Sequence, residues 1–155
     1  MKNLVPGARP DNDAGYLEMM TAVMFMSGLS RQVVMSKWDG FVAAFEEFDI
    51  DAVAGFTDVD VERLSQDARI VRYKAKIKAV VENARHMTEI AGRHGSFGAW
   101  LGVLLKSDGI EGAANELGKR FKYMSAESSR RYLWAVGEDI GDVDEKIRRK
   151  YGPAS

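Results

Sequence analysis

The residues with the clearest chemical potential lie in a basic stretch near the end of the chain. Lys119, Arg120 and Lys122 come just before Ser125, and a segment with helical spacing follows. A serine at a helix start caps backbone N–H groups, and the other N–H groups of the first turn attract anions. The stretch from Gly118 indicates a helix, a tight hairpin and a second helix. Three cations beside that turn would suit a nucleic-acid phosphate.

The net charge of −1 averages two unlike halves of the chain. Residues 1–68 carry 5 basic and 12 acidic side chains, whereas residues 69–155 carry 17 and 11, which gives formal charges of −7 and +6. The C-terminal half is therefore the part expected to face a polyanion. The basic runs at residues 69–78 and 146–150 are either further phosphate contacts or ordinary solvated helix faces.

Composition excludes several other kinds of protein. A chain of 155 residues with 46% hydrophobic residues suits one packed domain, residues 1–155. Without cysteine and with two histidines, it offers no disulfide, thiolate zinc site or cysteine-bound cluster, so we expect no metal and no cofactor. No apolar run suits a membrane span or a secretory signal, and we expect a cytoplasmic protein.

Apolar residues recur with helical spacing along most of the chain, and the alternation typical of strands is absent. We therefore expect an all-α fold. In the longest predicted helix an apolar stripe points inward, and Lys76 and Lys78 lie on other faces. The expected helices cover residues 13–26, 30–48, a short segment from Asp49, 59–66, 74–93, 97–106, 110–117, 125–136 and 143–151.

Three stretches resemble a known family. Residues 28–32 are Gly-Leu-Ser-Arg-Gln, residues 45–49 are Phe-Glu-Glu-Phe-Asp, and the run 60–85 contains Asp-Ala-Arg-Ile-Val-Arg-Tyr-Lys-Ala-Lys-Ile. The chain resembles the helix-hairpin-helix DNA glycosylase superfamily, most closely the 3-methyladenine DNA glycosylase I branch, over residues 16–105 and 117–151. The resemblance implies a two-lobed helical bundle that removes a damaged base from double-stranded DNA.

The resemblance also gives the basic stretch a role. The run Lys-Tyr-Met-Ser at residues 122–125 matches the family's DNA-binding hairpin, although it lacks the usual glycines. Tyr123, Met124 and Ser125 are therefore expected to contact DNA together with the three cations. Enzymes of the superfamily that also cut the backbone have a lysine where this chain has Glu127, which implies a monofunctional enzyme.

A catalytic carboxylate is expected about twenty residues beyond the hairpin, where Asp144 matches the superfamily pattern. Its implied role is to stabilise the cationic sugar that develops as the base leaves, and to orient the attacking water. Asp142 and Glu145 have the spacing of a capping box, so a first-turn helix role for Asp144 is the alternative. Asp139 or Asp142 could also face the cleft in its place.

A base-flipping enzyme must fill the gap that the flipped base leaves in the duplex. By resemblance, Gln32 is the wedge and Arg31 lies beside it; the alternative is an exposed pair in a helix capped by Ser30.

The flipped base also needs apolar or aromatic walls, although aromatic residues with helical spacing are more often core. The candidates are Tyr16, Val23, Phe25, Trp38 and Trp100.

This sequence differs from the 3-methyladenine branch at positions that select the substrate base. The branch's pocket Glu aligns with Val23 and its stacking Trp with Arg31, and this chain lacks the cysteines of the branch's zinc site. These differences argue for a base other than 3-methyladenine. We expect a monomeric, monofunctional N-glycosylase. A non-catalytic DNA-binding protein of glycosylase descent is the main alternative, and a helical protein-interaction module is a third.

Overall fold

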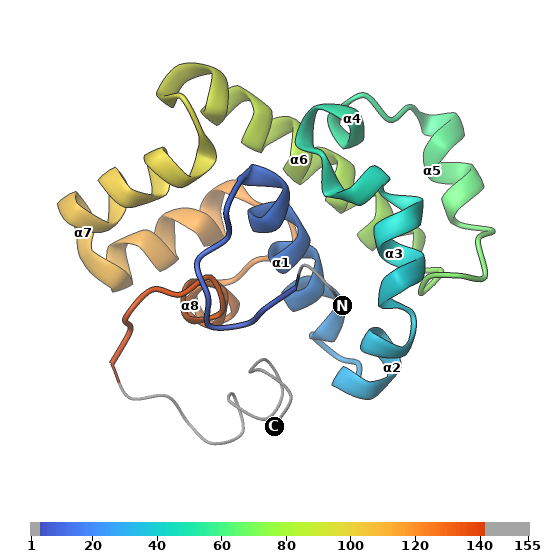
Figure 1. Cartoon of the computed structure of the whole chain (residues 1–155), viewed down its shortest axis with the longest axis horizontal. Coiled ribbons are helices and arrows are strands. Elements are labelled where there is room, and N and C mark those ends of the chain that lie inside the picture. The colour runs from blue at the N-terminus through green and yellow to red at the C-terminus, as the bar shows by residue number, and fades with distance from the viewer. Residues whose placement is uncertain (1–3, 142–155) are drawn as a thin grey trace.

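The computed structural model describes residues 4–141, and within them every regular element is helical (Figure 1). The all-α expectation is confirmed. In this part of the chain no helix is both long and apolar enough to span a bilayer. The elements are α1 (Asp13–Met26), α2 (Arg31–Ser36), α3 (Trp38–Ala44), the short 3-10 helix η1 (Glu46–Phe48), α4 (Ile50–Ala54), α5 (Asp58–Leu64), α6 (Lys74–His94), α7 (Phe97–Arg120) and α8 (Ala126–Ala135).

The helices form two groups joined by α6. In Figure 1, α2, α3, α4 and α5 lie on one side, and α1, α7 and α8 lie on the other. Helix α6 packs against α4 and α5 in the first group and against α1 and α7 in the second. The two-lobed arrangement implied by the resemblance is therefore present, and α6, together with α1, packs against helices of both groups.

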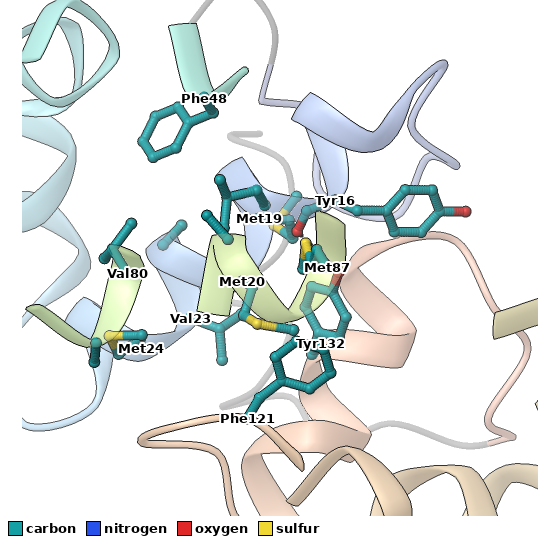
Figure 2. Close-up of a cluster of buried hydrophobic side chains, with 14 of the residues drawn as sticks. Tyr16, Met19, Met20, Val23, Met24, Phe48, Val80, Met87, Phe121 and Tyr132 are labelled. Carbon is teal, nitrogen blue, oxygen red and sulfur yellow. Dashed lines mark hydrogen bonds between the residues drawn. The ribbon is translucent and has the colours of Figure 1, made fainter. Parts of the chain in front are cut away.

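Helix α1 lies at the centre of the molecule and is buried on nearly all sides. Its Met19, Met20 and Met24 pack with residues of α6 and α8, as Figure 2 shows for Met87 and Tyr132. A helix that is apolar all round must be covered by others. The hydroxyl of Tyr132 also donates to the carbonyl oxygen of Tyr16 at 2.8 Å, which ties α8 to the first turn of α1.

The start of α1 is joined to the start of α7. The side chain of Asn12 caps α1 by accepting from the N–H of Gly15 at 3.1 Å. The Asp13 carboxylate instead accepts from the N–H groups of Phe97 and Gly98, at 2.9 and 3.3 Å. A carboxylate at the positive end of a helix is stabilising, so one side chain anchors two helices that lie 84 residues apart in the sequence.

The single helix expected over residues 30–48 is wrong. The backbone breaks at Lys37 (φ −108°, ψ 5°), which separates α2 from α3, and η1 follows α3. The break turns Trp38 and Phe41 into the core, where their rings stack at 4.9 Å, and leaves Val33 45% exposed on α2. The apolar spacing alone could not show that these residues belong to two helices that point in different directions.

The two helices expected at residues 97–106 and 110–117 are arms of α7 that meet at Gly109. Gly109 has φ 71° and ψ −177°, outside the helical region, and a glycine tolerates a positive φ without the cost that a side chain would add. The second arm continues to Arg120 and so reaches the hairpin directly. The other expected helices agree with α1, α4, α5, α6 and α8 to within a few residues, and residues 143–151 lie outside the described part of the chain.

A buried acid–indole pair joins α1 to α3. Trp38 donates its indole N–H to the carboxylate of Glu18 at 2.8 Å, and Glu18 is 4% exposed. Burial raises the pKa of Glu18, and the hydrogen bond from Trp38 opposes that rise. A carboxyl whose folded-state pKa is raised contributes most to stability when protonated, and that contribution is lost as the pH rises through the folded pKa.

Replacing Trp38 by Phe should lower the free energy of unfolding by about 3 kcal/mol, through the lost hydrogen bond to Glu18 and a smaller ring. Because the bond favours the ionised carboxylate, the cost should grow as the pH rises through the Glu18 pKa. Urea unfolding at several pH values measures it. In a Glu18→Gln background, the destabilisation caused by Trp38→Phe should be smaller by about 1 kcal/mol, because the cavity left by the smaller ring is the same but no carboxylate remains. An equal destabilisation in both backgrounds would contradict the hydrogen bond between Trp38 and Glu18.

Candidate nucleic-acid interface

The segment 121–125 forms a tight hairpin between α7 and α8, as the basic stretch predicts. Its side chains alternate between core and surface: Phe121 and Met124 are buried, whereas Lys122, Tyr123 and Ser125 are exposed. The two inward residues anchor the hairpin and the outward ones face solvent. Met124, expected to touch DNA, therefore lies on the inner side in this structure.

A buried side chain of α6 fixes the hairpin backbone. The Asn83 side-chain oxygen accepts from the N–H of Lys122 at 2.8 Å, and its amide nitrogen donates to the carbonyl oxygen of Lys122 at 3.2 Å. Asn83 is 1% exposed. Sequence reasoning missed this residue, although a polar amide beside an apolar helical stripe is a signal, because a buried amide requires partners.

The start of α8 has the features of an anion site. The Ser125 hydroxyl accepts from the N–H of Ser128 at 3.0 Å, and the Ser128 hydroxyl accepts from the N–H of Ser125 at 2.8 Å, which forms a reciprocal cap. The N–H groups of Ala126 and Glu127 belong to the same first turn, where no helical carbonyl can reach them. An anion at this end would meet those N–H groups and the positive end of the helix dipole.

The three expected cations differ in their surroundings. Lys119 and Lys122 are exposed on either side of the turn. Arg120 is also exposed, but its Nε donates to Glu116 at 2.6 Å and its guanidinium lies 5.5 Å from the centre of the Trp100 ring. Arg120 is therefore partly committed to its own helix, and the two lysines are better placed to meet a phosphate.

The expected wedge lies in residues 27–32, here called the wedge segment. Gly28 takes φ 91° after α1 ends, and Ser30 then caps α2 by accepting from the N–H of Val33 at 3.2 Å. Gln32 is exposed on the first turn of α2, and Arg31 beside it is half-buried. The placement of Gln32 agrees with both the wedge role and the ordinary capped-helix alternative.

Lys76 of α6 binds the wedge segment from the protein interior. It was expected on a solvated face of α6, yet it is buried, and its ammonium donates to the carbonyl oxygens of Met24 at 3.2 Å and Ser27 at 3.0 Å. It also lies 5.6 Å from the centre of the Phe25 ring and 5.5 Å from that of Tyr73. The last carbonyls of a helix lack partners within it, and a lysine is a suitable donor for them.

The basic run at residues 69–78 is thus not one solvated face. Lys76 points inward, Arg69 pairs with Asp67 at 2.7 Å, and Lys74 pairs with Glu62 at 2.5 Å. These ion pairs are exposed and contribute little to stability. Lys76 therefore cannot take part in the contact with the DNA backbone that was one expectation for this run.

One face of α6 therefore carries both halves of the candidate interface. Lys76 binds the wedge segment and Asn83 binds the hairpin, and the two residues are seven positions apart. Seven residues make two turns and about 10 Å of helix. The separation of the wedge segment from the hairpin is set by this one rigid element.

The candidates for the base pocket lie mostly in the core. Val23, Phe25 and Trp38 have no exposed surface, and Trp100 is also buried. Tyr16 is buried but borders a cavity of about 700 Å³, between the starts of α1 and α7, that Arg9, Gly98 and Lys106 also line.

The catalytic candidate Asp144 and its alternative Asp142 lie outside the described residues. Asp139 is described, and its carboxylate accepts from the N–H of Gly141 at 3.0 Å. Within residues 4–141 no three or more histidine, aspartate and glutamate side chains come together in a way that could hold a metal ion.

Comparison with known proteins decides the family. Residues 7–133 match the model of the methyladenine glycosylase family. The chain belongs to this family. A stretch of 77 residues is 42% identical to DNA-3-methyladenine glycosylase 1 of Escherichia coli, and it covers 49% of this chain and 41% of that enzyme.

Solved structures agree on the fold. The 3-methyladenine DNA glycosylase I of Staphylococcus aureus superposes with a TM-score of 0.77 at 22% identity, over 89% of this family member and 84% of that chain. A 3-methyladenine DNA glycosylase I in complex with 3-methyladenine gives a TM-score of 0.78 at 21% identity, over 97% and 91% of the two chains. The sequence match spans less than half of the curated E. coli relative, whereas the fold is shared almost throughout.

Proposed function

We propose that this protein is a monofunctional N-glycosylase that removes a damaged, alkylated base from duplex DNA and leaves an abasic site. The observation that carries the proposal is that a member of the methyladenine glycosylase family holds a basic hairpin and a wedge segment on one face of α6. The relatives named as DNA-3-methyladenine glycosylases support alkylated bases as the substrate class.

The proposed reaction divides between binding and chemistry. Lys119, Lys122 and the start of α8 hold the phosphate backbone, while Gln32 occupies the gap left by the extruded base. The bond between C1′ of the sugar and the base nitrogen breaks, its electron pair leaves with the base, and water adds to C1′ and loses a proton. Asp144 stabilises the cationic sugar and accepts that proton. Glu127 stands where a backbone-cutting enzyme would have its lysine, so the abasic site remains intact.

The assembly and location follow from the same proposal. A two-lobed glycosylase engages one damaged site at a time, and we propose a monomer that meets its duplex DNA in the cytoplasm. Sedimentation of the protein with and without a short duplex would give the stoichiometry directly.

The experiment that tests the function is mass-spectrometric detection of free bases released from alkylated, deaminated and oxidised duplex DNA. Release of an alkylated base, with the DNA strand left uncut until alkali is added, is the expected result. Release of only deaminated or oxidised bases would overturn the substrate class, and strand cleavage without alkali would overturn the monofunctional assignment.

A second candidate function is favoured by one specific observation. Val23, which aligns with the branch's pocket Glu, and the wall candidates Phe25 and Trp38 are closed into the core. A glycosylase-like protein that binds DNA without excising a base would have no need of an open pocket. It would bind duplex DNA in a salt-sensitive manner and release no base from any substrate.

Both candidates predict the same response to removing the hairpin lysines. Lys119→Ala and Lys122→Ala should each weaken duplex binding and make the slope of log K against log salt concentration shallower by about 0.9, the value for one lost phosphate contact. Fluorescence anisotropy at several salt concentrations measures the slope. Lys106→Ala, an exposed lysine on the first arm of α7, is the matched control and should leave the slope unchanged. An unchanged slope in the hairpin variants would remove this segment from the interface.

A further inference from the structure

Two exposed tyrosines meet between the wedge segment and the hairpin. Tyr73 is the residue before α6, and Tyr123 is at the outer turn of the hairpin; their side chains are 49% and 48% exposed. The two side chains lie close enough to interact, although they are fifty positions apart in the sequence. Most other aromatic rings of residues 4–141 are buried, so two half-exposed rings on neighbouring elements stand apart.

The backbone at Tyr123 is strained. Its φ is 60°, in the left-handed region that a side chain makes unfavourable and that a glycine would occupy without cost. The neighbouring Lys122 backbone is held at both its N–H and its carbonyl by Asn83, so the conformation is imposed by the surroundings. An exposed aromatic residue kept at a position where glycine would cost less is a candidate for a functional role.

The position of Tyr73 connects the pair to the wedge segment. Its ring centre is 5.5 Å from the ammonium of Lys76, which in turn binds the carbonyl oxygen of Ser27. Tyr123 directly follows Lys122, the exposed cation of the hairpin. The two rings therefore bridge the segments that the proposed function assigns to the flipped-base gap and to the phosphate backbone.

We propose that Tyr73 and Tyr123 together form a stacking contact for an unstacked nucleobase of the bound duplex, beside the wedge segment. Extruding one base leaves its partner without a stacking neighbour, and aromatic side chains stack on any exposed base because every base has a π-face. The inference rests on the proposed DNA binding. It assigns a role to Tyr73, which the sequence patterns did not single out, and to the ring of Tyr123 rather than its backbone.

The test is the affinity for a fluorescein-labelled duplex with one abasic-site analogue, which leaves the opposite base unpaired. Tyr123→Gly and Tyr73→Ala should each weaken binding about tenfold, with a smaller effect on a fully paired duplex. The salt slope should not change, because no charge is lost. Tyr123→Phe keeps the ring and should bind within twofold of the wild type, as should Val103→Ala, an exposed apolar residue on α7.

Tyr123→Gly also separates this role from a structural one. A glycine relieves the strained φ, so its unfolding temperature should be at least that of the wild type while binding falls. If the wild type binds the duplex and both Tyr123→Gly and Tyr73→Ala bind equally well, the stacking contact is overturned and the proposed DNA binding stands. If the wild type binds no DNA, both fail. Should Tyr123→Gly unfold at a lower temperature, the affinity of Tyr73→Ala alone decides.

Discussion

Replacing Asn83 by leucine should loosen the hairpin and weaken DNA binding, although Asn83 itself is buried and does not face the DNA. The change removes both hydrogen bonds to the Lys122 backbone and leaves that N–H and carbonyl without their protein partner. Because Lys122 lies at the surface, water can replace some of the lost hydrogen bonding, and we expect about 2–3 kcal/mol less stability to urea. The hairpin would then sample other conformations, and duplex affinity should fall about tenfold or more.

Hydrogen exchange at the hairpin amides provides the direct measurement. The Lys122 amide should exchange much faster in Asn83→Leu, and the change should stay within the hairpin and the start of α8. Thr88→Val is the matched control on the same helix: it removes the hydrogen bonds from the Thr88 hydroxyl to the carbonyl oxygens of Ala84, at 2.9 Å, and Ile50, at 3.4 Å, without touching the hairpin. It should lower stability yet keep duplex affinity. Equal losses of affinity in the two variants would mean that Asn83 acts only through overall stability.

Replacing Asp144 by asparagine should lower the rate of base release by about 10²- to 10⁴-fold while duplex affinity stays within a few-fold. The amide has nearly the shape of the carboxylate but cannot stabilise a developing positive charge or take a proton from water. Single-turnover release of the free base, measured with enzyme in excess over damaged duplex, isolates this step from product release.

Asp139→Asn and Asp142→Asn form the comparison set for the catalytic assignment. Asp139 accepts a hydrogen bond from Gly141, so its replacement should affect the local turn and leave the rate largely unchanged. If Asp142→Asn gives the large loss and Asp144→Asn does not, the catalytic carboxylate is Asp142. Full activity in all three variants would place the chemistry outside this segment.

The sequence by itself determined the features that depend on neighbours along the chain. Apolar spacing and capping side chains gave α1 its bounds and placed α6 within one residue, because a helix forms from contacts three and four positions apart. The cluster of Lys119, Arg120 and Lys122 beside a serine-capped turn likewise predicted the hairpin. The family resemblance rested on short runs of residues, and the family comparison confirms it.

The tertiary structure alone decided which polar side chains turn inward. Asn83 finds Lys122 39 positions away, Lys76 reaches Ser27 49 positions away, and Trp38 pairs with Glu18 across 20. In the sequence nothing near Asn83, Lys76 or Glu18 along the chain identifies the partner that each will bind. Their partners exist only after the lobes have packed, since a buried donor or acceptor must be satisfied wherever the fold places it. The separation of wedge segment and hairpin was therefore set by packing against α6 and could not be read from local spacing.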